Sequence, residues 1–514
     1  MKKIFLFLFS LSFISVVYSQ EKYTISGYVQ DLSSGESLIG VSIYDKRNYK
    51  GTTSNQYGFY SLTIEKGTYD IIYSFIGYKS IVKTVNLNKD IRYNISLEND
   101  AIITDEVIVT GERLDKNVSS SNMSQAKLEV ENIKQLPVIL GEVDVLKTAQ
   151  LLPGIQSGGE GNSGLYVRGG GPDQNLILLD EAVVYNAAHL FGFFSVFNAD
   201  AIKDINIIKG GMPAEYGGRL SSVLDISMKD GNNKKYEVDG GIGLLSSRLT
   251  LQGPIVKEKS SFIVSGRRTY VDVLSRPFVK KGGSFSGSGY YFYDLTTKIN
   301  YKISDKDKLY LSGYFGRDVF NFNNGKNDIG IQIPWGNATT SLRWNHLFNN
   351  KLFMNTSLIF SDYRFAFNIQ QTDFELKIFS GINDWNTKID FLYQPNQRHT
   401  IKFGTNYTYH AFTPGNATGK SGEVEFAPDK IFKQYSNEGA LYLSDDIELT
   451  DVLKIHAGLR YSSFQHSGYI SFRDYIKNEF DGSNNNYRNI EPRLTLRYKL
   501  NTVSSIKAAY TQNY

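Results

Sequence analysis

Residues Gly164–Ile226 read GLYVRGGGPDQNLILLDEAVVYNAAHLFGFFSVFNADAIKDINIIKGGMPAEYGGRLSSVLDI. Three short runs rich in Ile, Leu and Val stand out in this segment, at Leu176–Leu179, Ile202–Ile208 and Val223–Ile226. Turn-forming residues bound each run, which is typical of short buried strands. Clusters of glycine separate the runs and allow tight turns and close approach of the backbone. The segment therefore predicts a small α+β domain with glycine-rich loops.

The sequence pattern changes after this segment. From Tyr236 to Tyr514, apolar and polar residues alternate in runs of about ten residues, as in Ile401–His410 and Lys454–Ser462. Side chains alternate between the two faces of a strand, so each run carries one apolar face. A soluble sandwich would bury that face as core, whereas a membrane barrel would turn it to lipid. Roughly thirteen such strands can be marked, which is more than one sandwich holds and favours a barrel.

Connections between these strands differ in length. Short polar turns alternate with longer inserts, as they do in bacterial barrels with short periplasmic turns and long external loops. We expect the inserts to form the outer surface that captures a ligand. They lie at Lys280–Gly289, Asn321–Gly336, Pro414–Asp429 and His466–Tyr487.

Composition narrows the function classes. The 514 residues include 56 Lys and Arg against 52 Asp and Glu, a formal charge of +4, which gives no sign of nucleic-acid binding. Cysteine is absent, which excludes disulfides, thiolate metal sites and cysteine nucleophiles. The six histidines show no metal-ligand spacing, and no nucleotide-binding or hydrolase motif occurs. We therefore expect no metal site, no cofactor and no enzyme activity.

The N-terminal part has two features. Met1–Ser19 combines Lys2 and Lys3 with an apolar core and a small residue before Gln20, which is typical of a secretory signal peptide. Tyr23–Leu97 contains six strand-like runs separated by turns, and resembles the carboxypeptidase regulatory-like β-sandwich. Because no zinc-ligand set accompanies it, only the fold of that module is implied.

The central segment supports a second resemblance. VRGGGPDQNLILLDEAVVY and IKDINIIKGGMPAEYGGRLSSVLDI, preceded by LGEVDVLKTAQLLPGIQSGGEGNSG at Leu140–Gly164, resemble the plug domain of TonB-dependent outer-membrane receptors. The resemblance implies a mainly β fold with an N-terminal sandwich, an α+β plug and a partial transmembrane antiparallel barrel. The family has about 22 barrel strands, and AAYTQNY ends within an apparent strand, so we expect a C-terminally truncated chain.

The expected domain boundaries follow from the two resemblances. They are 1–19 for the signal peptide, 20–98 for the carboxypeptidase regulatory-like sandwich, 99–121 for a linker with the TonB box, 122–232 for the plug, and 233–514 for the incomplete barrel.

The linker contains an acidic start followed by a β-branched run, which is suited to adding a strand to a partner sheet. It is also compatible with a plain linker or with the last strand of the sandwich. In the family this position resembles the TonB box, where the inner-membrane-anchored TonB protein pairs. The expected TonB-binding residues are Asp105, Glu106, Val107, Ile108, Val109 and Thr110.

The resemblance also implies contacts between plug and barrel. Arg168 and Lys209 stand before glycine, where basic residues of the family pair with barrel acids and hold the plug. Glu491, in IEPRLTLRY, is the candidate acidic partner. Lysine in place of the arginine common at the second position weakens a bidentate pairing.

Asn186–Asn198 is unusually aromatic for a connection between two strands. It is either core or an apical loop that faces the substrate, and a lone histidine there is more often structural than a ligand. In the second interpretation the substrate-facing residues are Tyr185, His189, Phe191, Phe193 and Phe194.

These features predict an outer-membrane receptor that imports a scarce ligand into the periplasm with energy delivered by TonB. The expected partners are TonB, outer-membrane lipid, an unidentified small ligand and a surface lipoprotein that acts as a lid, without nucleic acid. The ligand classes that suit an aromatic vestibule include siderophores, corrinoids, oligosaccharides and peptides. The alternative is a secreted or surface-attached multidomain β protein that acts as an adhesin, which would not need the ordered plug motif.

Overall fold

The structure is a computed structural model. It describes residues 21–47, 51–100, 118, 120–121, 123–134, 143–159, 164–279, 283, 286–324, 328–427, 433–467 and 486–514. The predicted signal peptide and the proposed TonB box, Asp105–Thr110, lie outside the described residues. Among the helices that are described, none is long and apolar enough to cross a membrane.

The N-terminal module (residues 21–100) is built from two small sheets. One has the order β4-β1-β7 with β8 also paired to β1, and the other has the order β3-β2-β5-β6. Ile25, Tyr60, Ile71 and Leu97 are among the residues of a core that both sheets bury. The strands are β1 (Lys22–Asp31), β2 (Ser42–Asp45), β3 (Gly51–Thr53), β4 (Phe59–Glu65), β5 (Gly67–Ser74), β6 (Ile81–Leu87), β7 (Ile91–Arg92) and β8 (Ile95–Leu97).

The second unit, which we call the plug, has a five-stranded sheet in the order β13-β12-β17-β16-β9. The three predicted apolar runs lie on β12, β16 and β17 and pack against a helix whose N-cap is Asp144. The elements are β9 (Gln125–Glu129), α3 (Val130–Ile133), α4 (Val145–Gln150), β10 (Ile155–Ser157), β11 (Leu165–Val167), η2 (Pro172–Gln174), β12 (Asn175–Leu179), β13 (Ala182–Val183), β14 (Ala188–His189), η3 (Leu190–Gly192), β15 (Phe194–Ser195), β16 (Ile202–Ile208) and β17 (Ser222–Met228).

The remaining strands form one antiparallel sheet that curves around the plug. Thirteen strands form the wall in sequence order, and β27 (Val424–Phe426) pairs with β26 alone. The wall strands are β18 (Glu237–Ile242), β19 (Ser246–Val256), β20 (Ser260–Thr269), β21 (Gly289–Lys302), β22 (Asp307–Asn324), β23 (Ile329–Leu347), β24 (Leu352–Gln371), β25 (Phe374–Asn396), β26 (His399–Ser421), β28 (Gln434–Glu448), β29 (Leu453–Ser467), β30 (Asn486–Lys499) and β31 (Ser505–Thr511). This confirms the predicted partial barrel. Between β20 and β21 lie α5 (Val271–Leu274) and η4 (Arg276–Phe278).

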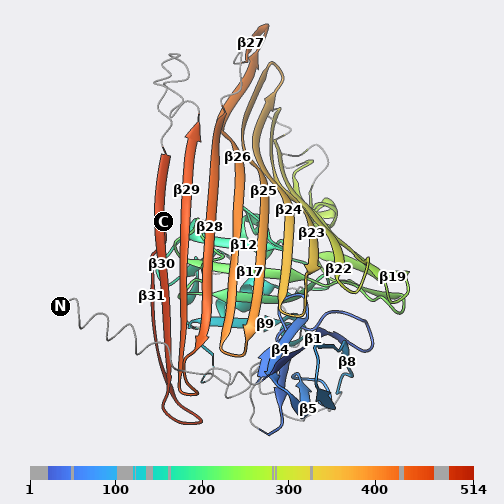
Figure 1. The fold of residues 1–514 in the computed structure, drawn as a ribbon. Helices are drawn as coiled ribbons and strands as arrows, with labels where there is room; N and C mark the ends of the chain where they lie inside the picture. The colour runs from blue at the N-terminus through green and yellow to red at the C-terminus, as the bar shows by residue number, and fades with distance from the viewer. Residues whose placement is uncertain are drawn as a thin grey trace, which may run out of the picture.

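The plug lies on the concave side of this wall. Figure 1 shows β12 and β17 behind β25 to β29, running across the direction of the wall strands. Buried wall residues such as Phe292, Asn345 and Ser357 face it. The segment Gly164–Ile226 therefore packs against the concave face of the later strands, which agrees with its resemblance to a plug domain.

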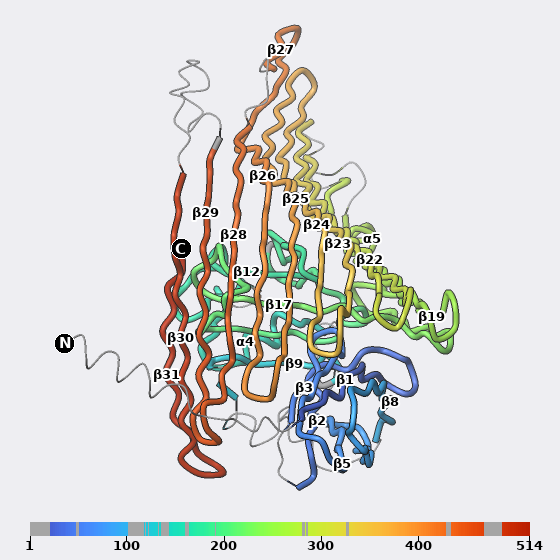
Figure 2. The backbone as a smooth tube through the Cα atoms, viewed as in Figure 1, coloured from blue at the N-terminus to red at the C-terminus, as the bar shows by residue number. Residues whose placement is uncertain are grey.

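Several wall strands continue far beyond the length that a membrane requires. β25 and β26 each have 23 residues, whereas about 9–11 residues cross the hydrocarbon layer. Figure 2 shows β25, β26 and β27 projecting past the neighbouring strands. The expected inserts at Asn321–Gly336 and Pro414–Asp429 are therefore largely strand, which corrects the sequence interpretation. Backbone pairing between neighbouring strands continues through both inserts, although their composition is that of loops.

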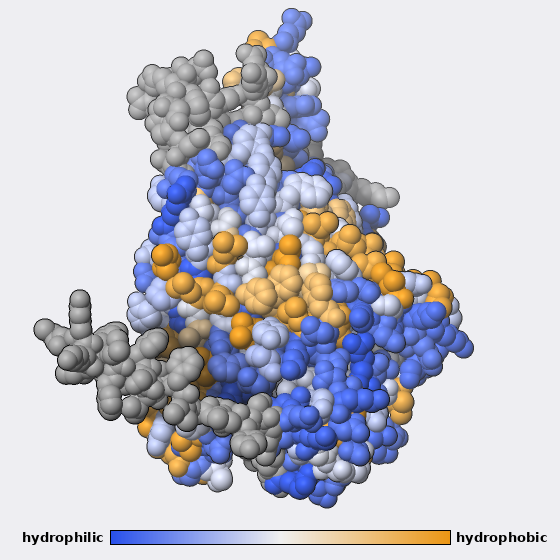
Figure 3. Space-filling model, viewed as in Figure 1, coloured by the Kyte–Doolittle hydropathy of each residue, from blue (hydrophilic) through white to orange (hydrophobic). Residues whose placement is uncertain are grey.

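The outer face of the wall carries an apolar belt. Ile299, Leu311, Leu342 and Leu358 are direct neighbours across β21 to β24, and all four side chains are exposed. Figure 3 shows apolar side chains gathered in a band across this face. An exposed apolar band of this kind is what a lipid bilayer covers.

The ends of the wall differ, which orients it. Short turns connect β21 to β22, β23 to β24 and β28 to β29, at 303–306, 348–351 and 449–452, as predicted. The opposite end also has a two-residue turn, between β24 and β25, but its hairpins project far past the neighbouring strands (Figure 2). Long projections of this kind are typical of the external side of bacterial barrels, so the other end is periplasmic. The N-terminal module lies at this end (Figure 1), where Arg92 donates to Asn350 at 3.4 Å.

A charge placed in the apolar belt should destabilise the wall. We expect Leu358→Arg, at a side chain that is 53% exposed, to cost about 2–4 kcal/mol because the guanidinium would sit at membrane depth. The measurement is the urea midpoint for unfolding in lipid vesicles. The matched control is Phe426→Arg on β27, which is 62% exposed but projects beyond the belt and should change the midpoint little. Equal effects at the two sites would contradict the position of the belt.

Candidate functional site at the plug–barrel seam

The first contact between plug and wall is a two-residue turn. Leu179 pairs with Ala182 across the β12–β13 hairpin, so Asp180 and Glu181 form its tip. Both residues have positive φ, at 47° and 73°. Two-residue hairpins favour that geometry, but side chains other than Gly, Asn or Asp adopt it at a cost. We call Asp180 and Glu181 the acidic turn.

Basic residues of the wall surround the acidic turn. Asp180 lies 2.9 Å from Arg343 and 3.1 Å from Lys298. Glu181 lies 3.6 Å from Lys388, and it accepts hydrogen bonds from Asn355 at 3.0 Å and from Ser357. The partners come from β21, β23, β24 and β25, so one turn ties the plug to four strands.

Burial and charge act in opposite directions on the acidic turn. Burial alone would raise the pKa of Asp180, but Arg343 and Lys298 outweigh it and hold that pKa below its ordinary value. The same balance, with Lys388 as the main cation, lowers the pKa of Glu181. Both residues therefore remain charged, and each charge has a partner inside a dry interface.

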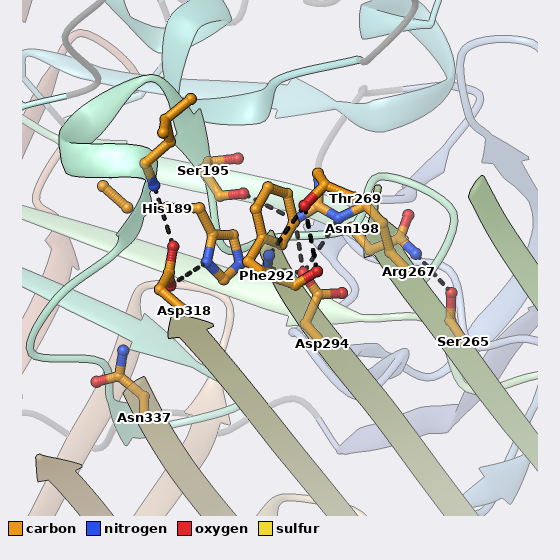
Figure 4. A network of polar contacts seen from close by, with 12 residues as sticks. His189, Ser195, Asn198, Ser265, Arg267, Thr269, Phe292, Asp294, Asp318 and Asn337 are labelled. Atoms are coloured by element: carbon orange, nitrogen blue, oxygen red, sulfur yellow. Dashed lines mark hydrogen bonds and ion pairs between the residues drawn. The ribbon is translucent and has the colours of Figure 1, made fainter. Parts of the chain in front are cut away.

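The second contact is centred on His189. Its Nδ1 lies 2.6 Å from Asp318 and its Nε2 lies 3.1 Å from Asp294, and its ring stacks on Phe292 at 3.9 Å. Figure 4 shows the imidazole held between the two carboxylates, with Arg267 beyond Asp294. Arg267 pairs with Asp294 at 2.7 Å and donates to the Ser195 carbonyl of the plug at 2.9 Å.

The surroundings of His189 favour its charged form. Burial would lower its pKa, but Asp318 and Asp294 together raise that pKa above the usual value. When His189 is protonated, its charge and that of Arg267 balance the charges of Asp294 and Asp318.

The third contact is an arginine clamp on the opposite part of the wall. Arg493 donates to the plug carbonyls of Met212 at 3.2 Å and Tyr216 at 2.7 Å, and also to Pro213. Arg460 donates to the carbonyls of Ala214 at 3.2 Å and Glu215 at 3.4 Å. A Cβ at Gly217 would lie 2.4 Å from Nε of Arg460, so glycine is needed for this approach.

The structure places Glu491 behind this clamp. Its carboxylate lies 2.6 Å from Arg493 and 3.9 Å from Arg460, and accepts from Ser462 at 2.6 Å. Glu491 thus pairs with wall arginines that reach the plug, rather than with Arg168 or Lys209. A direct pairing of Glu491 with Arg168 or Lys209 stays a prediction.

Arg168 and Lys209 make contacts inside the plug. Arg168 donates to Ser124 at 2.5 Å, and Lys209 donates to the Pro153 carbonyl at 2.7 Å. Within the described part of the chain, neither forms an ion pair with a carboxylate of the wall. A role for them as contacts to the wall stays a prediction.

The predicted substrate-facing residues separate into three groups. His189 and Phe194 are only 1% and 3% exposed, and Phe194 packs with Tyr290, Phe292 and Trp335. The core interpretation therefore applies to both. His189 lies between two wall carboxylates, and Phe194 packs among aromatic side chains of the wall. Phe193 packs partly buried against the same cluster. The side chain of Phe191 lies outside the described residues.

Tyr185 is half-buried and donates to Asp384, which also lies 2.7 Å from His410. Contact of Tyr185 with a ligand stays a prediction. Among the residues that the structure describes, no group of three or more His, Asp or Glu side chains is arranged to hold a metal ion.

Sequence reasoning did not single out Asp180 and Glu181. The signal was present as two acids that directly follow the buried run Leu176–Leu179 and precede a second apolar run. A charged pair in a tight turn between buried strands must find opposite charges or water. The basic partners, however, are scattered from Lys298 to Lys388, so only the fold brings them together.

Comparisons with known proteins agree with this architecture. Residues 25–109 match the carboxypeptidase regulatory-like domain, residues 112–222 match the TonB-dependent receptor plug domain, and residues 269–514 match the TonB-dependent receptor-like β-barrel. The chain belongs to the TonB-dependent receptors. Members of this family lie in the outer membrane, as does this receptor.

One curated relative is the vitamin B12 transporter BtuB of Vibrio vulnificus, which is 28% identical over 145 residues. That match covers 27% of this chain and 23% of BtuB.

Solved structures show the same fold. A mutant of the ferric enterobactin receptor PfeA from Pseudomonas aeruginosa is 16% identical with a TM-score of 0.53, covering 78% of this receptor and 63% of PfeA. FrpB, an iron transporter from Neisseria meningitidis, is 14% identical with a TM-score of 0.54, covering 76% and 63%. FpvA from P. aeruginosa, solved with pyoverdine, is 13% identical with a TM-score of 0.57, covering 76% and 57%. The receptor chain spans less than two thirds of each relative.

Removing one charge of the acidic turn should loosen the plug. Asp180→Asn would leave Arg343 and Lys298 without their shared carboxylate, which we expect to cost about 3–5 kcal/mol. The measurement is the urea concentration at which a protease begins to cut the plug of the receptor in detergent. Asp173→Asn, at an exposed position of η2, is the control and should leave that concentration unchanged. An unchanged value for Asp180→Asn would contradict the role of the turn.

Retention of the plug should also depend on pH through His189. Because its folded pKa is raised, its contribution is fully present below the unfolded value of about 6.5 and is lost as pH rises through the folded pKa. We expect the urea midpoint for plug release to fall more between pH 6 and pH 9 in the native receptor than in His189→Gln. The difference between the two proteins isolates His189 from Asp294, Asp318, Tyr290 and Arg267. Identical pH profiles would show that the imidazole carries no charge there.

Proposed function

We propose that this receptor is an active transporter that binds a scarce external ligand and moves it into the periplasm with energy from TonB. The observation that carries the proposal is the plug held against the concave side of the wall. A plug held by the acidic turn, the His189 contact and the arginine clamp leaves no reason to expect free diffusion.

The number of contacts between plug and wall supports a mechanical energy source. Displacement of the plug must break contacts to several wall strands together: Asp180 with Arg343, His189 with Asp294, and the Tyr216 carbonyl with Arg493. Spontaneous displacement of the plug would therefore be rare. Because the outer membrane has no nucleotide supply, the work must be delivered by a protein that reaches it from the inner membrane.

Asp105–Thr110 is the proposed attachment point for TonB. An extended segment with β-branched residues can add a strand to a partner sheet through main-chain hydrogen bonds. The segment lies between the N-terminal module and the plug, so a pull on it is transmitted to β9, the first plug strand and an edge of the plug sheet.

The names of the relatives suggest which ligands to test first. BtuB is a vitamin B12 transporter, FrpB is an iron transporter, and PfeA is a ferric enterobactin receptor. We propose an iron chelate or a corrinoid as the first candidates, with oligosaccharides and peptides to follow. A surface lipoprotein that closes over the long external strands is a further proposed partner.

The adhesin alternative does not account for the wall. A water-soluble adhesin has no need for the outward row Ile299, Leu311, Leu342 and Leu358. Extraction distinguishes the two functions, because a barrel requires detergent and changes its gel migration on boiling. Release of the protein into buffer without detergent would support the adhesin.

Growth of a deletion strain on limiting iron, corrinoid, glycan and peptide sources identifies the ligand class. With that class known, Val107→Pro tests the energy coupling, because proline removes a backbone donor from the proposed inter-protein strand. We expect uptake to collapse while binding at the cell surface persists. Val107→Thr keeps the N–H group and the β-branched shape, so it should transport normally. Undiminished uptake by the proline variant would remove Asp105–Thr110 from the mechanism.

A further inference from the structure

The N-terminal module is docked on both other parts of the receptor. Tyr28, Tyr57 and Phe59 of the module pack against Leu347 and Phe353 of the wall. The ring of Phe353 stacks on Phe59 and on Tyr57, each at 5.4 Å between centroids. This cluster is separate from the module's own core, in which none of these three module side chains takes part. The module therefore uses a dedicated apolar surface for docking.

Polar contacts join the module to the plug in the same region. Glu36 lies 3.3 Å from Lys203 on β16 and accepts from the backbone of Asp230 at 3.1 Å. Lys127 on β9 donates to the Ile39 carbonyl at 3.3 Å. The module thus contacts β9 and β16 of the plug through polar groups, and it contacts the wall through Phe353.

Tyr57 is at the centre of this junction. Its hydroxyl donates to Glu181 of the acidic turn at 3.3 Å, and Arg343 lies 5.7 Å above its ring. Burial, followed by the charge of Glu181, raises the pKa of Tyr57 far above its usual value, so the hydroxyl remains a neutral donor. Tyr57, Gln56 and Ile39 close a cavity of about 30 Å³ whose other lining includes Asp180, Lys298 and Arg343. That volume holds about two waters, so little space is left at this point.

We propose that the N-terminal module is a periplasmic gate. Docked, it covers the junction of plug and wall at the periplasmic end and fixes both, so the plug cannot move until the module leaves. This inference rests on the proposed transport function for its purpose, but the gate itself is a property of the contacts. Because the module directly precedes Asp105–Thr110 in the chain, a pull there acts on the module and on the plug together. Undocking then precedes remodelling of the plug.

A disulfide provides the first test. The chain has no cysteine, so a pair of introduced cysteines forms a single cross-link. Gly35 of the module and Asn233, which precedes β18, suit this purpose. A Cβ built on Gly35 would lie 2.5 Å from Cγ of Asn233, and the Ser34 carbonyl accepts from the Asn233 N–H at 2.8 Å. Gly35 has φ of 74°, so the substitution strains the turn modestly.

The measurement is protease cleavage of the plug in the detergent-solubilised receptor at increasing urea, and opening means that half of the plug is cut. Urea weakens apolar contacts, so the plug becomes accessible when the docked arrangement fails. We expect the plug of oxidised Gly35→Cys/Asn233→Cys to stay protected at the urea concentration that opens the native receptor. Reduction with dithiothreitol should restore the native response.

A second variant loosens the gate without a cross-link. Phe353→Ala removes the ring on which Tyr57 and Phe59 stack, so opening should occur at a lower urea concentration. Phe391→Ala is the matched control on the next strand. The Phe391 ring stacks on Phe403 at 4.8 Å, away from the module cluster, so its removal should leave the opening concentration unchanged.

Three results would overturn the gate. They are failure of the two cysteines to cross-link in a membrane-inserted receptor, equal opening of the oxidised and reduced forms, and an unchanged response of Phe353→Ala. Protease cleavage of the plug needs neither TonB nor the natural ligand. Failure of the transport proposal, detected by Val107→Pro, therefore leaves this test intact, and failure of the gate leaves the transport proposal intact.

Discussion

The pairing of the acidic turn with wall cations is the constraint on which the rest of the receptor depends. Asp180 and Glu181 carry charges into a buried interface, so they are tolerated only where opposite charges meet them. Arg343, Lys298 and Lys388 supply those charges from separate strands. Only a wall in its correct register brings these three cations to the acidic turn, where they pair with the two buried carboxylates.

This arrangement explains why the interface is polar. An apolar interface of the same size would be difficult to separate and join again in a defined register, whereas ion pairs specify one position and regain solvation when water enters. His189, Arg460 and Arg493 extend the principle around the lumen, since each contact uses a charge from one unit and an acceptor from another. The docked module adds a third unit to the junction through Tyr57 and Glu36.

The fold could be predicted from the sequence in most respects, whereas the contacts between plug and wall could be predicted only in part. The runs Leu176–Leu179, Ile202–Ile208 and Val223–Ile226 became strands because their apolar side chains require burial, and the two-residue period beyond Tyr236 became the wall. The inserts around Asn321 and Pro414 were predicted as loops from their composition, but backbone pairing continues through them, and pairing does not depend on side-chain type. Arg168 and Lys209 were expected to meet Glu491, yet the clamp that Glu491 supports is formed by Arg460 and Arg493.

The sequence by itself determined the properties that depend on neighbours along the chain. These are the alternation that makes each wall strand two-faced, the glycines that permit close turns, and the order of module, plug and barrel. The tertiary structure alone decided which charges meet, because the partners of Asp180 and His189 lie more than one hundred residues away. A charge pattern along one strand does not state which side chain of another strand will lie opposite it. That depends on the register and curvature of the whole wall, which place acids of the plug against bases of the barrel.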